Sequence, residues 1–243
     1  MKQYSAYLFD LYGTLVDIHT DENKPAFWKQ VAGYYAAHGA AWEAAALRAA
    51  YLRLCAAETE RLLKLYPDAA VEIDLLRVFR SLYAEKGCSP DAALLADTAW
   101  AFRRASTTHL RAYAGAGELL DSLRAAGRIV ILLSNAQSCF TRPELDCLGL
   151  TKSFDRIFIS SERGFQKPDP RFFHAPLEEL NLDPVDCLMI GNDPICDLGG
   201  AARVGMDAVY IHSGLSPRTS VSSGAVLALP QMDLRSLRRL LLA

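Results

Sequence analysis

The chain has 243 residues, of which 51% are hydrophobic, and a formal net charge of −2. A substantial core can therefore form, while a general electrostatic attraction to nucleic acid or to an anionic membrane is excluded. The first residues are too few and too polar for a signal peptide, and no apolar run approaches membrane-spanning length. Six cysteines without a CxxC pair or zinc-like spacing predict reduced thiols in a cytoplasmic protein. We expect a monomer or homodimer whose partner is a small-molecule substrate.

The first predicted strand runs up to a carboxylate. Tyr7-Leu8-Phe9 is apolar and β-prone, and Asp10 follows it directly, which is typical of a buried parallel strand. Gly13 then permits a tight turn, and Thr14 offers a hydroxyl and an N–H beside the acid. Because ligands of open α/β sheets bind at the carboxyl ends of strands, Asp10 can attack a substrate, bind a metal, or do both. The plainer alternative is that Asp10 only caps a turn.

A helical region follows this turn and interrupts the α/β pattern. It is rich in Ala, Leu, Tyr and Arg, and its Gly and Pro breaks predict about four helices that end near Arg111, with no strand among them. We therefore expect residues 17–111 to form a helical domain inserted into a core made of residues 1–16 and 112–243. Since this domain begins directly after the Asp10 turn, it should lie above the carboxyl ends of the strands, where a lid belongs.

The strand pattern returns after the helical region. Further strands are predicted at residues 129–133, 156–160, 187–190, 208–211 and 226–229. Helices are predicted at residues 117–126, between 135 and 149, from 169 onward, at 197–204 and after Asp233. Strands that alternate with helices indicate an α/β fold with a parallel sheet and right-handed crossovers.

Polar side chains follow three more of the predicted strands. They are Ser134 and Asn135, then Lys167, then Asn192, Asp193 and Asp197. Each has an ordinary alternative role, as a turn residue, a solvated lysine or a helix cap. All of them are expected at one edge of the sheet, under a lid. Such a grouping arises by chance much less often than any one of these residues does, so it indicates a functional site.

Four segments, taken in order, resemble the four motifs of the haloacid dehalogenase-like hydrolase superfamily. They are residues 9–15 (Phe-Asp-Leu-Tyr-Gly-Thr-Leu), 133–135 (Leu-Ser-Asn), 166–169 (Gln-Lys-Pro-Asp) and 190–197 (Ile-Gly-Asn-Asp-Pro-Ile-Cys-Asp). The helical region resembles the cap that members carry between motifs one and two. The resemblance covers nearly the whole chain, and it implies a Rossmann-like parallel-sheet core with an inserted α-helical cap domain.

The same resemblance implies roles for individual residues. Asp10 stands where the family has its nucleophile, and Ser134 and Lys167 stand where it binds the phosphoryl or carboxylate group. Thr14 and Asn135 would join them in holding the substrate. In the phosphatase members, motif-four acids hold magnesium, and the ligand at the position of Tyr12 is a backbone carbonyl, which any residue supplies.

Two departures from the family pattern point in opposite directions. Phosphatases usually carry a second Asp two residues after the nucleophile as general acid and base, and here that position is Tyr12. Tyr12 is a poor base, and it either orients a water or leaving oxygen or packs against the cap. Its surroundings are similar to those of 2-haloacid dehalogenases, which work without a metal. The fourth motif of dehalogenases, however, resembles Ser-Ser-Asn-x-x-Asp. In this chain Asp193 adds a carboxylate at that motif, which a metal-free site does not need.

Electrostatic repulsion favours the metal-dependent interpretation. Two carboxylates about 4 Å apart repel by about 4 kcal/mol at an effective dielectric of about 20. Asp10, Asp193 and Asp197 would raise one another's pKa, and Lys167 alone does not offset all of them. A magnesium ion would offset the charge of these carboxylates, because it prefers hard oxygen ligands. The expected ligands are Asp10, the Tyr12 carbonyl and Asp193 or Asn192. Asp197 would contact these ligands without binding the metal itself.

The sequence thus predicts a magnesium-dependent phosphatase of a small phosphate monoester that forms an aspartyl-phosphate on Asp10. One alternative is a metal-free 2-haloacid dehalogenase, in which a cap arginine such as Arg48 receives the halide. Another is a binding protein that kept the site but lost turnover, although the complete set of Asp10, Ser134 and Lys167 argues against it. The sequence does not identify the substrate.

Overall fold

A parallel β-sheet forms the centre of the protein. The computed structural model describes residues 2–218 and 224–243, and within them six strands form one sheet in the order β5-β4-β1-β6-β7-β8. The strands are β1 (Ala6–Phe9), β4 (Ile129–Ser134), β5 (Arg156–Ile159), β6 (Cys187–Gly191), β7 (Asp207–Ile211) and β8 (Leu227–Leu229). Every neighbouring pair is parallel, which confirms the predicted fold class and all of the predicted core strands.

The register of the central strands brings the predicted site together. Phe9, the last residue of β1, pairs with Leu132 of β4 on one side and with Ile190 of β6 on the other. The residues that follow these three positions therefore emerge at the same edge of the sheet. Side chains alternate between the two faces of each strand, so Phe9 packs into one apolar layer and Leu8 into the other.

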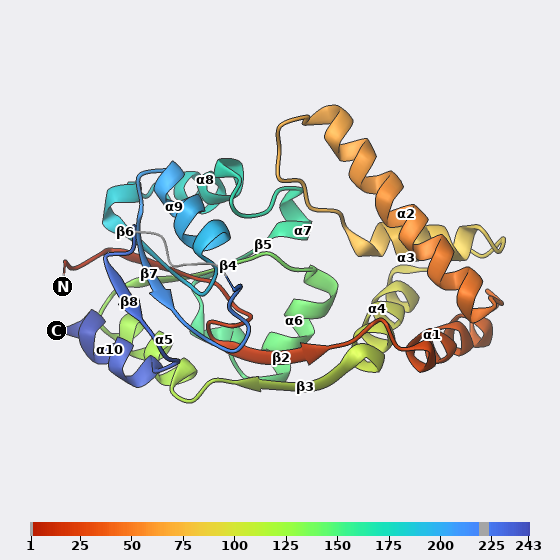
Figure 1. Cartoon of the computed structure of the whole chain (residues 1–243), viewed down its shortest axis with the longest axis horizontal. Helices are drawn as coiled ribbons and strands as arrows, with labels where there is room; N and C mark the ends of the chain where they lie inside the picture. Colours follow the sequence, from red (N-terminus) through yellow and green to blue (C-terminus); the bar gives the residue numbers. More distant parts are fainter. Residues whose placement is uncertain (1, 219–223) are drawn as a thin grey trace.

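Helices cover both faces of the sheet (Figure 1). The core helices are α5 (Ala116–Ala125), α6 (Ser138–Cys147), α7 (Ser160–Arg163), α8 (Pro170–Glu179), α9 (Gly200–Arg203) and α10 (Leu234–Leu242). Shorter segments are the 3₁₀ turns η1 (Thr151–Ser153) and η2 (Pro184–Asp186) and the π-helical η3 (Pro194–Gly199). Helices α5 and α10 contribute to one apolar layer and α8 and α9 to the other. The predicted cap Asp233 accepts the Ser236 N–H at 2.9 Å at the start of α10.

The remaining helices form a separate unit, which we call the helical insert (residues 21–106). Its helices are α1 (Pro25–Ala37), α2 (Ala44–Leu65), α3 (Leu75–Ala84) and α4 (Ala92–Ser106), on the right of Figure 1. They enclose an apolar cluster of their own around Tyr35, Phe79 and Phe102. Phe140 of the core helix α6 belongs to this cluster, so α6 packs directly against the insert.

Two strands link the insert to the core, and here the sequence prediction was wrong. The last helix of the insert ends at Ser106 rather than near Arg111, and β2 (Val16–Thr20) pairs antiparallel with β3 (Thr107–Ala112). This ribbon runs along the lower edge of the molecule in Figure 1. Its strands carry mostly polar side chains and lie partly exposed, so they lack the apolar run that marks a buried strand. Their pairing joins residues about 90 positions apart, as in His19 with His109.

Two further features bear on the environment of the chain. Within residues 2–218 and 224–243, no helix combines the length and the apolar character needed to cross a bilayer. All six cysteines are free thiols in the structure.

Candidate active site

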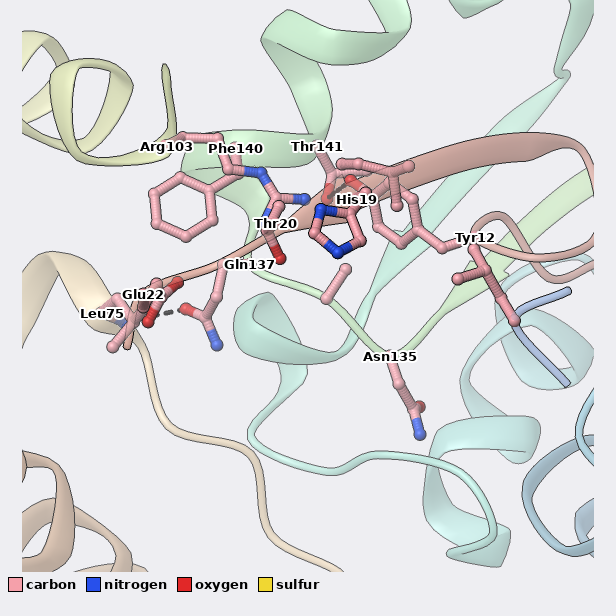
Figure 2. A pocket seen from close by; sticks show the side chains of 13 residues that line it. Tyr12, His19, Thr20, Glu22, Leu75, Arg103, Asn135, Gln137, Phe140 and Thr141 are labelled. Carbon is pink, nitrogen blue, oxygen red and sulfur yellow. Dashed lines mark hydrogen bonds between the residues drawn. The ribbon is translucent and has the colours of Figure 1, made fainter. Parts of the chain in front are cut away.

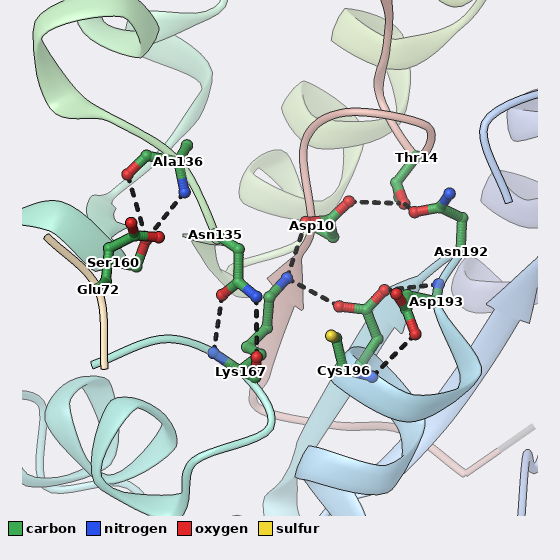
Figure 3. A network of polar contacts seen from close by, with 11 residues as sticks. Asp10, Thr14, Glu72, Asn135, Ala136, Ser160, Lys167, Asn192, Asp193 and Cys196 are labelled. Carbon is green, nitrogen blue, oxygen red and sulfur yellow. Dashed lines mark hydrogen bonds and ion pairs between the residues drawn. The ribbon is translucent and has the colours of Figure 1, made fainter. Parts of the chain in front are cut away.

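Asp10 and Lys167 meet at the carboxyl edge of the sheet. Lys167 Nζ donates to Asp10 Oδ1 at 2.7 Å and to Asp197 Oδ1 at 2.8 Å, and its side chain is only 2% exposed. Burial by itself lowers the pKa of Lys167, but the two carboxylates more than compensate and hold it above its usual value. Lys167 is therefore a fixed cation between the strand end of β1 and the segment that follows β6 (Figure 3).

Asn135 holds the loop that carries Lys167. Its Oδ1 accepts the Lys167 N–H at 2.7 Å, and its Nδ2 donates to the Lys167 carbonyl at 2.9 Å. The end of β4 and the loop of residues 164–169 are thus joined at two points. One amide hydrogen of Asn135 stays available for a ligand.

Thr14 and Asn192 lie on the other side of Asp10. Gly13 has φ +88°, and a Cβ at this position would stand 2.3 Å from Asn192 Nδ2, so the close approach of Asn192 requires glycine here. Thr14 Oγ1 lies 3.3 Å from Asp10 Oδ2 and 3.3 Å from Asn192 Oδ1. A hydroxyl has one hydrogen and satisfies only one of these acceptors, so the other receives none from Thr14.

The two acids after β6 differ in their surroundings. Asp193 Oδ1 accepts the N–H groups of Ile195 at 2.8 Å and Cys196 at 2.9 Å, so this carboxylate caps η3. Asp197 is buried and accepts the Asp193 N–H at 2.9 Å. Burial raises the pKa of Asp197, although the adjacent Lys167 opposes the shift. Asn192, rather than Asp193, places its side-chain oxygen next to the Thr14 hydroxyl.

Ser134, the last residue of β4, carries a buried hydroxyl that lacks a protein partner. Among the described residues it is one of four buried side chains with an unpartnered polar atom. Leaving such a group unpaired costs about 1–3 kcal/mol. The binding role assigned to Ser134 stays a prediction.

A small cavity of about 180 Å³ opens over Asp10. The charged side chains that line it are Asp10, Asp193, Asp197 and Lys167, so carboxylates outnumber cations. Within residues 2–218 and 224–243, no three His, Cys, Asp or Glu side chains are arranged so that they could hold a metal ion by themselves. A cation at this site would therefore need amide or main-chain oxygens in addition to carboxylates, and the amide oxygen of Asn192 is close at hand.

The Tyr12 hydroxyl points toward the core helix α6. It donates to Glu144 Oε2 and lies 3.0 Å from Thr141 Oγ1, while Arg103 Nε of α4 donates to Glu144 Oε1 at 2.6 Å. Burial and the charge of Glu144 raise the pKa of Tyr12 above its usual value. Tyr12 therefore keeps its proton at neutral pH, and the buried Arg103–Glu144 ion pair ties the helical insert to the core.

A larger cavity of about 570 Å³ lies between the insert and the core. It shares Tyr12, Asn135 and Leu215 with the small cavity, so the two spaces adjoin. On its wall Arg103 lies over the ring of Phe140, and Gln137 Oε1 accepts the Leu75 N–H at 2.9 Å (Figure 2). Glu22 also lines this cavity. Burial raises the pKa of Glu22, and the charge of Arg103 partly opposes this shift.

Arg48, the arginine expected to receive a halide, lies elsewhere. It is exposed and lines a different cavity of about 360 Å³ with Trp28 and Lys29 of α1. Among the described residues, Arg103 is the arginine of the insert that lines the larger cavity, which adjoins the small cavity at Asp10. Sequence reasoning missed Arg103 and its partner Glu144, because an arginine near the end of one helix and a glutamate in another carry no motif that links them.

Comparisons with known proteins identify the family of the chain. The family model for haloacid dehalogenase-like hydrolases matches residues 4–205, and the chain belongs to this family. It is 33% identical over 167 residues to phosphoserine phosphatase of Thermus thermophilus, which covers 69% of this chain and 64% of that protein. The chain thus spans somewhat less than two thirds of that relative. It is also 28% identical to (S)-2-haloacid dehalogenase 4A of Burkholderia cepacia, over 87% of this chain and 84% of the relative.

Solved structures support the same fold. A HAD phosphatase from Thermococcus onnurineus superposes with a TM-score of 0.62 at 21% identity and covers 98% of this chain and 97% of its own. A dehalogenase with an intermediate complex superposes with a TM-score of 0.61 at 23% identity, over 99% of this chain and 98% of its own. The chain is therefore a HAD-like hydrolase, and its relatives include both phosphatases and dehalogenases.

Proposed function

We propose that the protein is a magnesium-dependent phosphatase of a small phosphate monoester, with Asp10 as the nucleophile. The observation that carries this proposal is the excess of carboxylates around Asp10. Three aspartates and one lysine line the small cavity, and Lys167 is already shared between Asp10 and Asp197. An anionic substrate would meet net negative charge there unless a cation joined it.

The oxygen atoms near Asp10 fit a hard cation. Asp10 Oδ2 and Asn192 Oδ1 share one Thr14 hydroxyl, so at least one of them is short of a donor. Together with the Tyr12 carbonyl they would hold magnesium, and the Asp193 oxygen that does not cap η3 is the alternative ligand. A bound magnesium ion would neutralise charge on the substrate and the carboxylates.

The residues of the chain then divide the work. Lys167 orients Asp10 through its hydrogen bond to Oδ1. Asp10 attacks phosphorus and displaces the alcohol oxygen of the substrate, and water later cleaves the resulting aspartyl-phosphate to release phosphate. Ser134 and the free amide hydrogen of Asn135 would donate to the phosphoryl oxygens and stabilise the developing charge. Thr14, predicted from the sequence to join them, instead directs its hydroxyl at Asp10 and Asn192. Asp197 holds Lys167 from the far side. The helical insert would act as the cap that excludes water from this site.

The leaving group would extend past Tyr12 into the larger cavity. Glu22 and Arg103 give this cavity both a carboxylate and a guanidinium. Arg103 is paired with Glu144, whereas Glu22 forms no ion pair among the described residues, so Glu22 would favour an alcohol that carries hydroxyl or ammonium groups.

A second candidate activity is 2-haloacid dehalogenation. Two observations favour it. The position two residues after Asp10 holds Tyr12 rather than a carboxylic acid, and the Tyr12 hydroxyl is already bonded to Glu144. The dehalogenase relative noted above is the second observation. Asp10 would then attack carbon, and Arg103 rather than Arg48 would face the departing halide. A binding protein without turnover is disfavoured because the Asp10–Lys167–Asp197 arrangement is complete.

One experiment separates these activities. The purified chain is assayed with p-nitrophenyl phosphate, with magnesium and with EDTA, and with 2-chloropropionate without metal. The phosphatase proposal predicts p-nitrophenol release that needs magnesium and is lost in Asp10→Asn. Metal-independent chloride release without phosphatase activity would replace it by the dehalogenase proposal, and no turnover of either substrate class would favour the binding protein.

A further inference from the structure

The connection between α2 and α3 leaves the helical insert and lies against the core. In Figure 1 it runs down beside α7. The Gln166 N–H donates to the Ala70 carbonyl at 2.9 Å, and the Glu72 N–H donates to the Gly164 carbonyl at 3.0 Å. Val71 and Phe165 form an antiparallel bridge between these bonds. Residues 70–72 thus add a short strand-like segment, which we call the docking segment, to the loop that carries Lys167.

Side chains reinforce this contact on both sides. The Ala70 N–H donates to Asp169 Oδ2 at 3.0 Å, and Gln166 Nε2 donates to the Val71 carbonyl at 3.1 Å. Both core residues flank Lys167 within the same loop. The position of the loop, and with it the position of the Lys167 ammonium, is therefore coupled to the helical insert.

Glu72 extends the contact to the strand end of β4. Its Oε2 lies 3.0 Å from the Ser160 hydroxyl, whose single hydrogen can point to Glu72 or to the Ala136 carbonyl at 3.1 Å. Its Oε1 accepts Gln137 Nε2 at 3.0 Å. Ser160 Oγ in turn accepts the Ala136 N–H at 2.8 Å. Ala136 and Gln137 directly follow Asn135, the residue that clamps Lys167 at two points. Figure 3 shows the continuous path from Glu72 through Ser160 and Ala136 to Asn135, Lys167 and Asp10.

We propose that Glu72 is a positioning residue that the helical insert supplies to the active site, where it holds the Asn135 turn and the Lys167 loop in register. Glu72 does not reach the reacting atoms, and it acts through Ser160 and Gln137. The inference concerns a part of the site that phosphatase and dehalogenase chemistry share, so it does not rest on the choice between them.

The environment of Glu72 makes this contact sensitive to pH. Glu72 is half-buried and its partners Ser160 and Gln137 are neutral. The charged side chains of the elements packed around it are engaged elsewhere: Glu162 with Arg142, Arg163 with Glu179, Asp169 with Arg171, Lys167 with Asp10 and Asp197, and Asp74 with the Leu76 N–H. Burial without a cation raises the pKa of Glu72 from 4.5 to about 7.

The sign of the effect follows from linkage. The pKa is higher when the segment is docked than when Glu72 is in water, so docking favours the neutral acid and ionisation favours release. Docking is strongest at low pH, weakens as pH rises toward 7 and levels off above it. With the two pKa values above, the docking constant falls about tenfold between about pH 6 and pH 8.

Hydrogen exchange on the full chain tests the proposal, with rates corrected for the intrinsic pH dependence. We expect protection of the docking segment and of residues 164–169 to fall about tenfold from about pH 6 to pH 8 in the wild type. In Glu72→Gln, which resembles the neutral acid, protection should stay at its low-pH level across the range. Glu162→Gln, on neighbouring α7, is the matched control and should behave as the wild type. Unchanged pH dependence in Glu72→Gln would overturn the proposal.

Kinetics provide the second measurement. Glu72→Ala should lower protection of both segments at every pH and reduce kcat about tenfold with little change in KM, while Glu72→Gln restores kcat. If the Lys167 loop keeps its protection in Glu72→Ala, Glu72 does not position it. Hydrogen exchange is measured without substrate, so it tests the role of Glu72 even if the protein proves not to be a phosphatase.

Discussion

Tyr12 occupies the position where related phosphatases are expected to carry their general acid, and Tyr12→Phe tests what it does. The hydroxyl donates to the Glu144 carboxylate and contacts Thr141. A hydrogen bond to a charged group contributes about 1.5–3 kcal/mol. Because Glu144 keeps Arg103 as a partner in the variant, it is not left unpaired, and we expect a loss of about 2 kcal/mol in the free energy of unfolding.

Urea denaturation and thermal melting measure this change. For a chain of this size, about 2 kcal/mol corresponds to a decrease of about 4–8 °C in Tm. Tyr4→Phe is the matched control, since the Tyr4 hydroxyl donates to Asp207 Oδ2 at 2.9 Å just before β1, at the opposite end of that strand. It should lose a comparable amount of stability without any change in kinetics.

The kinetic result is what separates packing from catalysis. If the hydroxyl serves only Glu144, kcat for an alkyl phosphate should change by no more than about threefold, whereas general acid catalysis typically contributes about 10²–10⁴ in rate. A hundredfold or larger loss of kcat with unchanged stability would refute our account and make Tyr12 a proton donor. We also expect slow hydrolysis of alkyl phosphates in the wild type, because the free carboxylic acid is missing.

Two further predictions concern the same site, and a third concerns the helical insert. Asp10→Asn should abolish turnover while circular dichroism stays unchanged, since the amide is a poor nucleophile of nearly the same shape; residual activity in a clean preparation would remove Asp10 from that role. Asn192→Ala should raise the magnesium concentration for half-maximal activity about tenfold. Asp193→Ala should mainly lower the free energy of unfolding, by about 1 kcal/mol, because the cap of η3 is lost. The reverse pattern would make Asp193 the ligand. The helical insert should move on the β2–β3 ribbon and near Gly115, and identical solution scattering with and without a phosphate analogue would count against this motion.

The sequence by itself determined the sheet and the residues at its carboxyl edge. Buried strands read as short apolar runs, and this signal is local, so residues 129–133 and 187–190 were identified from their own composition. Parallel strands end at one edge, which is why Asp10, Lys167 and Asp197 were expected together without knowledge of any contact. Their motifs also identified the family.

Only the tertiary structure decided how the insert and the core meet. The sequence offered several arginines in the insert, and it is the packing of α4 against α6 that brings Arg103, rather than Arg48, to the cavity. Glu72 lies 88 positions from Ser160, and His19 lies 90 positions from His109, so neither contact leaves a periodic signal in the chain. Such contacts depend on the orientation of whole elements, which burial of the shared apolar surface sets only when the chain is folded.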